Sequence, residues 1–147
     1  MSNYTQKELE DFLALFRLTP YIDVVYIGKN RKLISDIKQF LSKSSGKLQT
    51  IESITTQDIR KKLKKSCCEY LILDSVILDS SNTTQLFELL SMTLRDSGHI
   101  ILLENKNKDK TILYNLLEQY DYGAVSSVDI FQDYDLIIAK KLHMWGM

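Results

Sequence analysis

Two acidic side chains in this sequence come directly after short strand-like segments, and each is placed to do chemistry at the edge of a core. Glu52 follows one such segment, and Asp74, with Ser75 next to it, follows another. Parallel strands end at one edge of a sheet, where ligand crevices open. Asp74, Ser75 and Asp79 can hydrogen-bond a substrate hydroxyl or amine there. A carboxylate that only caps a strand and orders the next loop produces the same pattern, so both interpretations stay open.

A glycine follows the first strand-like segment of the chain. Gly28 ends the segment Val24–Ile27 and is followed by Lys29, Asn30 and Arg31. Because glycine has no Cβ, it lets the backbone come close to a ligand. The long side chains that follow differ from the small residues of a ligand-binding loop, so the glycine alone does not define such a loop.

The other reactive residue types form no recognisable site. Cys67 and Cys68 are adjacent, which suits neither a disulfide framework nor a chelating pair. His99 and His143 are too far apart in sequence to argue a pairing. The sequence contains no nucleophile elbow, phosphate loop or metal-ligand cluster. We therefore expect no metal site.

Composition favours one globular domain over residues 1–147. The chain has 147 residues, 44% of them hydrophobic, and its 19 basic residues balance its 19 acidic ones, so no global field favours nucleic acid or a membrane surface. No apolar run approaches the roughly 20 residues of a membrane helix. The amino terminus lacks the basic end and apolar core of a signal peptide. We expect a cytoplasmic protein that has no membrane partner.

Hydrophobic periodicity predicts strands and helices in alternation. Thr5 and Glu8 have the spacing of a capping box, which predicts a first helix that ends near Thr19–Pro20. Strand-like segments and helical stripes then alternate up to a Ser97-Gly98 turn and a further strand and helix. After the first helix, the predicted strands are 24–27, 48–51, 70–73, 100–103, 123–128 and 134–140, and the predicted helices lie near 33–41, 56–65, 86–94 and 112–120.

The spacing of the last two predicted strands indicates how the sheet ends. Only five residues separate them, which is too short for a helical crossover, so they should form an antiparallel hairpin. The fold class predicted is α/β: a three-layer, Rossmann-like, mainly parallel sheet with helices on both faces and a C-terminal antiparallel hairpin, preceded by an N-terminal helix.

Three segments carry a resemblance to a known family. They are "EYLILDSVILDS" (Glu69 to Ser80), "LFELLSMTLRDSGHIILLE" (Leu86 to Glu104) and "YDYGAVSSVDIFQDYDLIIAKK" (Tyr120 to Lys141). In that order they resemble the fourth strand with its loop, the helix–turn–fifth strand unit, and the closing hairpin of class I S-adenosylmethionine-dependent methyltransferases.

The resemblance implies a cofactor cleft at the carboxyl ends of the strands. In the family a glycine-rich loop follows the first strand, an acid after the second takes the ribose hydroxyls, and residues after the fourth face the methyl group or the nucleophile. The resemblance makes Asp74 the candidate catalytic residue. The candidate S-adenosylmethionine-binding residues are Gly28, Lys29, Asn30, Glu52, Asp74 and Ser75.

The first half departs from the family pattern. Lys29 to Arg31 replace small residues, and Tyr26 stands where the family usually has an acid. Only 46 residues separate Gly28 from Asp74, so one strand and one helix of the seven-stranded plan should be absent. We expect a methyltransferase-like domain that is degenerate in cofactor binding and acts as a binding or scaffold module. The alternatives are an active methyltransferase with an altered pocket and, second, a receiver-like signalling domain whose acid would be Asp74.

Partner surfaces are predicted at three places. The basic segment Arg60 to Lys65 suits an acidic or phosphate ligand, although a solvated helix face gives the same composition. The N-terminal helix and the apolar tail from Leu142, which contains Trp145, are candidate surfaces for a protein partner or a homodimer. Each could instead pack within its own chain.

Overall fold

A computed structural model describes residues 3–52 and 55–142, and within these ranges strands and helices alternate. In chain order the elements are α1 (Gln6–Leu13), β1 (Asp23–Ile27), α2 (Arg31–Leu41), the 3-10 helix η1 (Ser42–Ser44), β2 (Lys47–Ile51), α3 (Thr56–Lys62), β3 (Cys68–Asp74), α4 (Thr83–Ser91), β4 (Leu94–Asn105), α5 (Thr111–Gln119), β5 (Tyr122–Val128) and β6 (Tyr134–Lys141).

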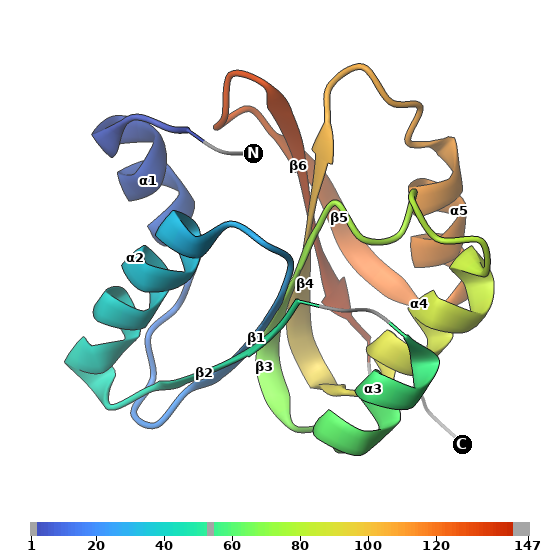
Figure 1. The fold of residues 1–147 in the computed structure, drawn as a ribbon, viewed down its shortest axis with the longest axis horizontal. Coiled ribbons are helices and arrows are strands. Elements are labelled where there is room, and N and C mark those ends of the chain that lie inside the picture. The colour runs from blue at the N-terminus through green and yellow to red at the C-terminus, as the bar shows by residue number, and fades with distance from the viewer. Residues whose placement is uncertain (1–2, 53–54, 143–147) are drawn as a thin grey trace.

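One six-stranded sheet runs through the described residues in the order β2-β1-β3-β4-β6-β5. The first four strands are parallel, and β6 is antiparallel to both β4 and β5. The last strand therefore inserts between β4 and β5, as expected for the closing hairpin (Figure 1). The predicted fold class, a mainly parallel α/β sheet that ends in a hairpin, is confirmed.

Helices cover both faces of this sheet and make three layers. α1 and α2 lie on one face, and α3, α4 and α5 lie on the other (Figure 1). Successive side chains of β1 serve the two cores in turn, with Val24 and Tyr26 facing α2 and Val25 and Ile27 facing the other helices. β1, an interior parallel strand, is therefore apolar on both faces, as this architecture requires.

The first helix is shorter than its sequence pattern predicts. Its capping box is present, but α1 ends at Leu13 and not near Thr19–Pro20. Beyond the helix, the Arg17 N–H donates to the Tyr70 hydroxyl at 2.9 Å. This bond to β3 replaces a continuing helical one, so the chain turns onto the sheet.

The predicted Ser97-Gly98 turn lies inside β4. The register between β3 and β4 shifts between Cys68 and Tyr70, which makes a bulge that absorbs the extra residues. Ser97 takes a positive φ of 68° there. A Cβ on Gly98 would lie 2.8 Å from the Glu69 carbonyl oxygen, so the close approach of two strands requires this glycine.

Both ends of the chain were candidate partner surfaces. The apolar face of α1 is buried within the chain, since Leu9 and Phe12 belong to the core on the α1–α2 face. Of the tail, Leu142 is exposed, and residues 143–147, with His143 and Trp145, lie outside the described residues. A dimer through either end stays a prediction. No helix among the described residues is long and apolar enough to span a membrane.

Candidate functional site

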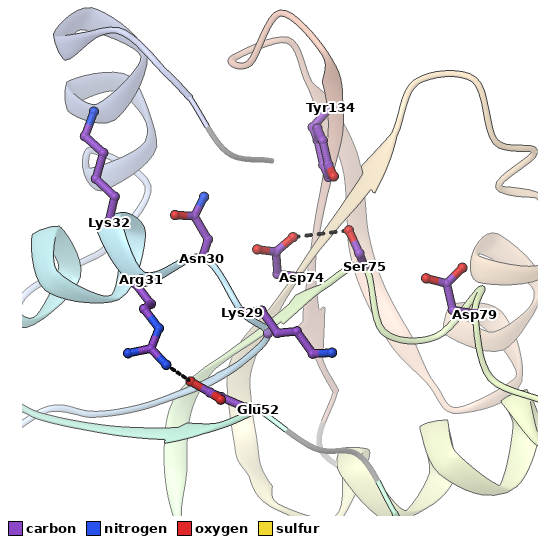
Figure 2. A pocket seen from close by; sticks show the side chains of 10 residues that line it. Lys29, Asn30, Arg31, Lys32, Glu52, Asp74, Ser75, Asp79 and Tyr134 are labelled. Atoms are coloured by element: carbon purple, nitrogen blue, oxygen red, sulfur yellow. Dashed lines mark hydrogen bonds and ion pairs between the residues drawn. The ribbon is translucent and has the colours of Figure 1, made fainter.

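The carboxyl ends of the parallel strands open onto a cleft of about 660 Å³. Figure 2 shows side chains from the β1–α2 loop, the end of β2, the end of β3 and β6 around it. All six residues predicted from the sequence line this cleft: Gly28, Lys29, Asn30, Glu52, Asp74 and Ser75. The topology thus brings together three segments that are far apart in sequence.

Asp74 stands at the end of β3 with both carboxylate oxygens engaged. The Tyr26 hydroxyl donates to Oδ2 at 2.5 Å, and the Ser75 hydroxyl donates to Oδ1 at 3.3 Å. Burial raises the pKa of Asp74 and also raises the pKa of Tyr26, which therefore remains a neutral donor. The Asn30 N–H in turn donates to the Tyr26 oxygen at 3.2 Å. The carboxylate is thus tied to the glycine loop.

Gly28 is surrounded by residues of its own chain. A Cβ at this position would lie 2.7 Å from the Asp74 Cβ and 2.8 Å from the Tyr26 hydroxyl oxygen. The Gly28 N–H donates to the Ile51 carbonyl oxygen at 3.0 Å, which ties the loop to β2. Internal packing against Tyr26 and Asp74 is therefore sufficient reason for a glycine here, without any ligand.

The mouth of the cleft carries charges of both signs. Arg31 and Glu52 form an ion pair at 3.6 Å between side chains that are 87% and 56% exposed. Such an exposed pair contributes about 0–1 kcal/mol, so it orients Glu52 without fixing it. Lys29 points across the cleft toward the side that carries Ser75 and Asp79 (Figure 2). A positive charge therefore lies within the cleft.

The opposite wall includes two residues outside the predicted binding set. Tyr134 points into the cleft from β6, and Asp79 lines it from the loop after β3 (Figure 2). The Lys108 ammonium donates a hydrogen bond to the Asp79 carboxylate, and this bond raises the pKa of Lys108. The sequence predicts Asp79 as a possible substrate contact. Tyr134 gave no such signal, since only the antiparallel insertion of β6 brings it to the cleft.

A buried carboxylate, Glu104, lies at the end of β4 and was not predicted. Glu104 is 3% exposed, and its Oε1 has no hydrogen-bond partner among the described residues. Burial raises its pKa to about 7, although the nearby Lys108 acts in the opposite direction. A sequence signal existed, because Glu104 directly follows the apolar run Ile100–Leu103 just as Asp74 follows its own strand residues.

Comparison with known proteins supports the architecture. No protein-family model and no curated protein matches this sequence. Among solved structures, an S-adenosylmethionine-dependent methyltransferase from Aquifex aeolicus is similar with a TM-score of 0.69 at 14% identity, over 96% of this chain and 95% of that one. The tRNA (m1A58) methyltransferase TrmI of the same organism gives 0.69 at 13% identity, over 98% of this chain and 72% of that one.

A third similar structure was solved with a product of the cofactor. It is phosphoethanolamine N-methyltransferase 2 of Haemonchus contortus in complex with S-adenosylhomocysteine, with a TM-score of 0.64 at 15% identity, over 97% of this chain and 40% of that one. The chain described here thus has the fold of class I S-adenosylmethionine-dependent methyltransferases. The receiver-like alternative is wrong, since the chain closes with the antiparallel β5–β6 pair.

Proposed function

We propose that this chain is a methyltransferase-like binding module whose cleft does not hold S-adenosylmethionine in the manner of the family. The observation that carries the proposal is the position of Tyr26. Its buried ring stands where the family usually has an acid, and its hydroxyl donates to Asp74 and lies against Gly28. Gly28 and Asp74 therefore contact Tyr26 and each other in the place where the family binds its cofactor.

The charges of the cleft support the same proposal. The methyl donor carries a positive sulfonium, and Lys29 extends a second positive charge into the same cleft. Like charges repel each other, so the Lys29 ammonium disfavours a sulfonium bound beside it. Glu52, the acid that would take the ribose hydroxyls, is meanwhile oriented by Arg31. Both features weaken the site for this cofactor.

An active methyltransferase is the second candidate, and the size of the cleft favours it. About 660 Å³ lies within the range of roughly 300–1,000 Å³ that is usual for ligand pockets. Gly28, Glu52 and Asp74 all line this space. Methyl transfer requires little more than holding the nucleophile and the methyl group in line, so a general base is not needed.

A ligand titration separates the two candidates. The melting temperature of the full chain is followed with rising S-adenosylmethionine and S-adenosylhomocysteine, beside a class I methyltransferase of known affinity. We expect no shift. A ligand that binds only the folded state would add about 2.7 kcal/mol at a hundredfold excess over its dissociation constant, and a shift of that size would favour the enzyme.

Two variants tell whether any binding uses the cleft. Glu52→Gln removes the charge at the cleft mouth, and Glu10→Gln removes an exposed charge on α1 that does not line it. If the wild-type chain binds the cofactor and only Glu52→Gln weakens binding, the active-enzyme alternative replaces our proposal.

The cytoplasmic location stays a prediction, which fractionation of the native cell would test.

A further inference from the structure

Another cavity lies between α3 and α4, and no described residue lines both this cavity and the cleft. Its volume is about 300 Å³. Its floor is apolar, and cations stand around it. The apolar residues are Ile59, Leu63, Leu89 and Met92, and the cations are Arg60, Lys64 and Lys65; we call this the α3–α4 groove.

The fold of the basic segment Arg60 to Lys65 determines which of its cations line the groove. α3 ends at Lys62 and not at Lys65, because Leu63 takes an extended conformation with φ −117° and ψ 134°. The chain beyond the helix is held at the end of α4, where the Ser66 N–H donates to the Met92 carbonyl oxygen at 2.9 Å. Lys64 and Lys65 thereby line the groove, whereas Lys61 and Lys62 do not.

The groove cations have no acidic partner in the part of the chain that the structure describes. None of Arg60, Lys64 and Lys65 forms an ion pair there, and all three are exposed. Cations in the last turn of a helix are favourable because of the helix dipole, which accounts for Arg60. Lys64 and Lys65 lie beyond the helix, so this explanation does not extend to them.

The apolar residues at the floor of the α3–α4 groove indicate that a ligand bound there has an apolar group. Ile59 and Leu63 are buried, but Met92 is 39% exposed at the end of α4. Methionine is flexible and adapts to apolar ligand groups. A volume of about 300 Å³ is at the lower end for ligand pockets, so it suits one apolar side chain more than a cofactor.

We propose that the α3–α4 groove binds an acidic peptide segment of a partner protein, with one apolar side chain inserted between α3 and α4. Carboxylates on either side of that anchor pair with Arg60, Lys64 and Lys65. This inference rests on the proposed function, in that the bound segment is what the module recognises. It does not require the cleft to be empty or filled.

Two other anionic partners fit the groove less well. Single-stranded nucleic acid binds through aromatic side chains on which bases stack, and none of the described residues that line this groove is aromatic. A membrane surface requires a broad apolar face beside the cations, whereas Met92 is the one exposed large hydrophobic side chain among the described residues of the groove lining. Charge together with a small apolar floor favours a peptide.

Fluorescence polarisation with a labelled peptide, Glu-Asp-Glu-Leu-Phe-Glu-Asp-Glu, tests the proposal on the full chain. We expect binding that weakens from about 50 to about 500 mM salt. The double variant Lys64→Glu with Lys65→Glu should weaken it about tenfold or more. Met92→Asp, or a peptide with Ser in place of Leu and Phe, should also weaken binding. Circular dichroism checks that each variant is folded.

The matched control is Lys61→Glu with Lys62→Glu, which makes the same charge change outside the groove. We expect it to weaken binding much less than the groove variant. Equal loss in both variants, no effect of Met92→Asp, no binding at all, or tighter binding of oligouridine or phosphatidylserine vesicles would each overturn the proposal. Titration of the same variants with S-adenosylmethionine tests the cleft separately, so the two proposals can fail independently.

Discussion

Asp74 and Glu104 are carboxylates on neighbouring strands, and their different surroundings give them different chemistry. Asp74 faces the α1–α2 side of the sheet, where Tyr26 and Ser75 satisfy both of its oxygens. Glu104 faces the other side, where it accepts from the Leu78 N–H and keeps one oxygen without a partner in the described residues. The two carboxylates thus differ in hydrogen bonding because hydroxyl donors lie beside Asp74 on its face of the sheet and no donor of the described residues is bonded to Glu104 Oε1 on the other face.

Glu104 should make stability depend on pH. Burial raises its pKa from 4.5 to about 7, so the folded state keeps a proton that the unfolded state loses. The free energy of unfolding should therefore fall as pH rises from about 4.5 to about 7, by at most about 3 kcal/mol. Urea denaturation across this pH range measures the slope.

The control for this prediction is Glu104→Gln, which keeps the shape and cannot ionise. We expect it to flatten the slope and to exceed the wild type in stability above pH about 7. Asp79 and Lys108, which face Glu104, remain in both proteins. A variant that keeps the wild-type slope would show that another group causes it.

Among the elements, β4 departs most from its sequence pattern. The sequence predicts Leu94 as the end of the preceding helix and Ser97-Gly98 as a turn, whereas the structure has both inside β4, with a bulge in its pairing with β3. A turn and a bulge both favour a glycine and both can contain a residue at positive φ, so the residue types alone do not distinguish them. Pairing with β3, which is distant in sequence, makes it a bulge.

Gly98→Ala should destabilise the protein by about 2 kcal/mol or more, because the added Cβ meets backbone that cannot move easily. It would lie 2.8 Å from the Glu69 oxygen and 2.9 Å from the Arg95 oxygen. Gly123→Ala is the control. There the three atoms nearest to the added Cβ all belong to the exposed side chain of Leu142, the nearest at 3.0 Å. Equal urea midpoints for the two variants would refute the predicted clash.

In the whole molecule, α1 joins the start of the chain to the closing hairpin. Phe12 is fully buried, and its ring lies 5.6 Å from that of Phe131, which precedes β6. The Gln132 N–H also donates to Glu8 at 2.8 Å. α1 is therefore part of the core on this face and not an appendage.

Phe12→Ala should cost about 3–5 kcal/mol of unfolding free energy, because it leaves a cavity between α1 and the hairpin. Tyr114→Ala, which removes a ring that is 41% exposed on α5, should change stability by about 0.5 kcal/mol or less. Hydrogen exchange distinguishes two outcomes. We expect protection to fall throughout the sheet, and a loss confined to residues 6–13 would contradict the coupling.

The sequence by itself determined the order and type of the elements and the group of residues around the cleft. Periodicities of two and about 3.6 residues are local, and parallel strands place their carboxyl ends together whatever their exact register. Glu52 and Asp74 could thus be assigned to one site before any contact was known. The hairpin followed equally from the five residues between its strands.

Only the tertiary structure decided what these residues bond to. Tyr26 and Asp74 are 48 positions apart, and their hydrogen bond depends on the pairing of β1 with β3. Likewise, the groove exists because the chain after α3 is bonded to the end of α4. A hydrogen bond needs its two atoms placed within a fraction of an ångström, and packing between distant segments sets such positions, whereas local patterns do not.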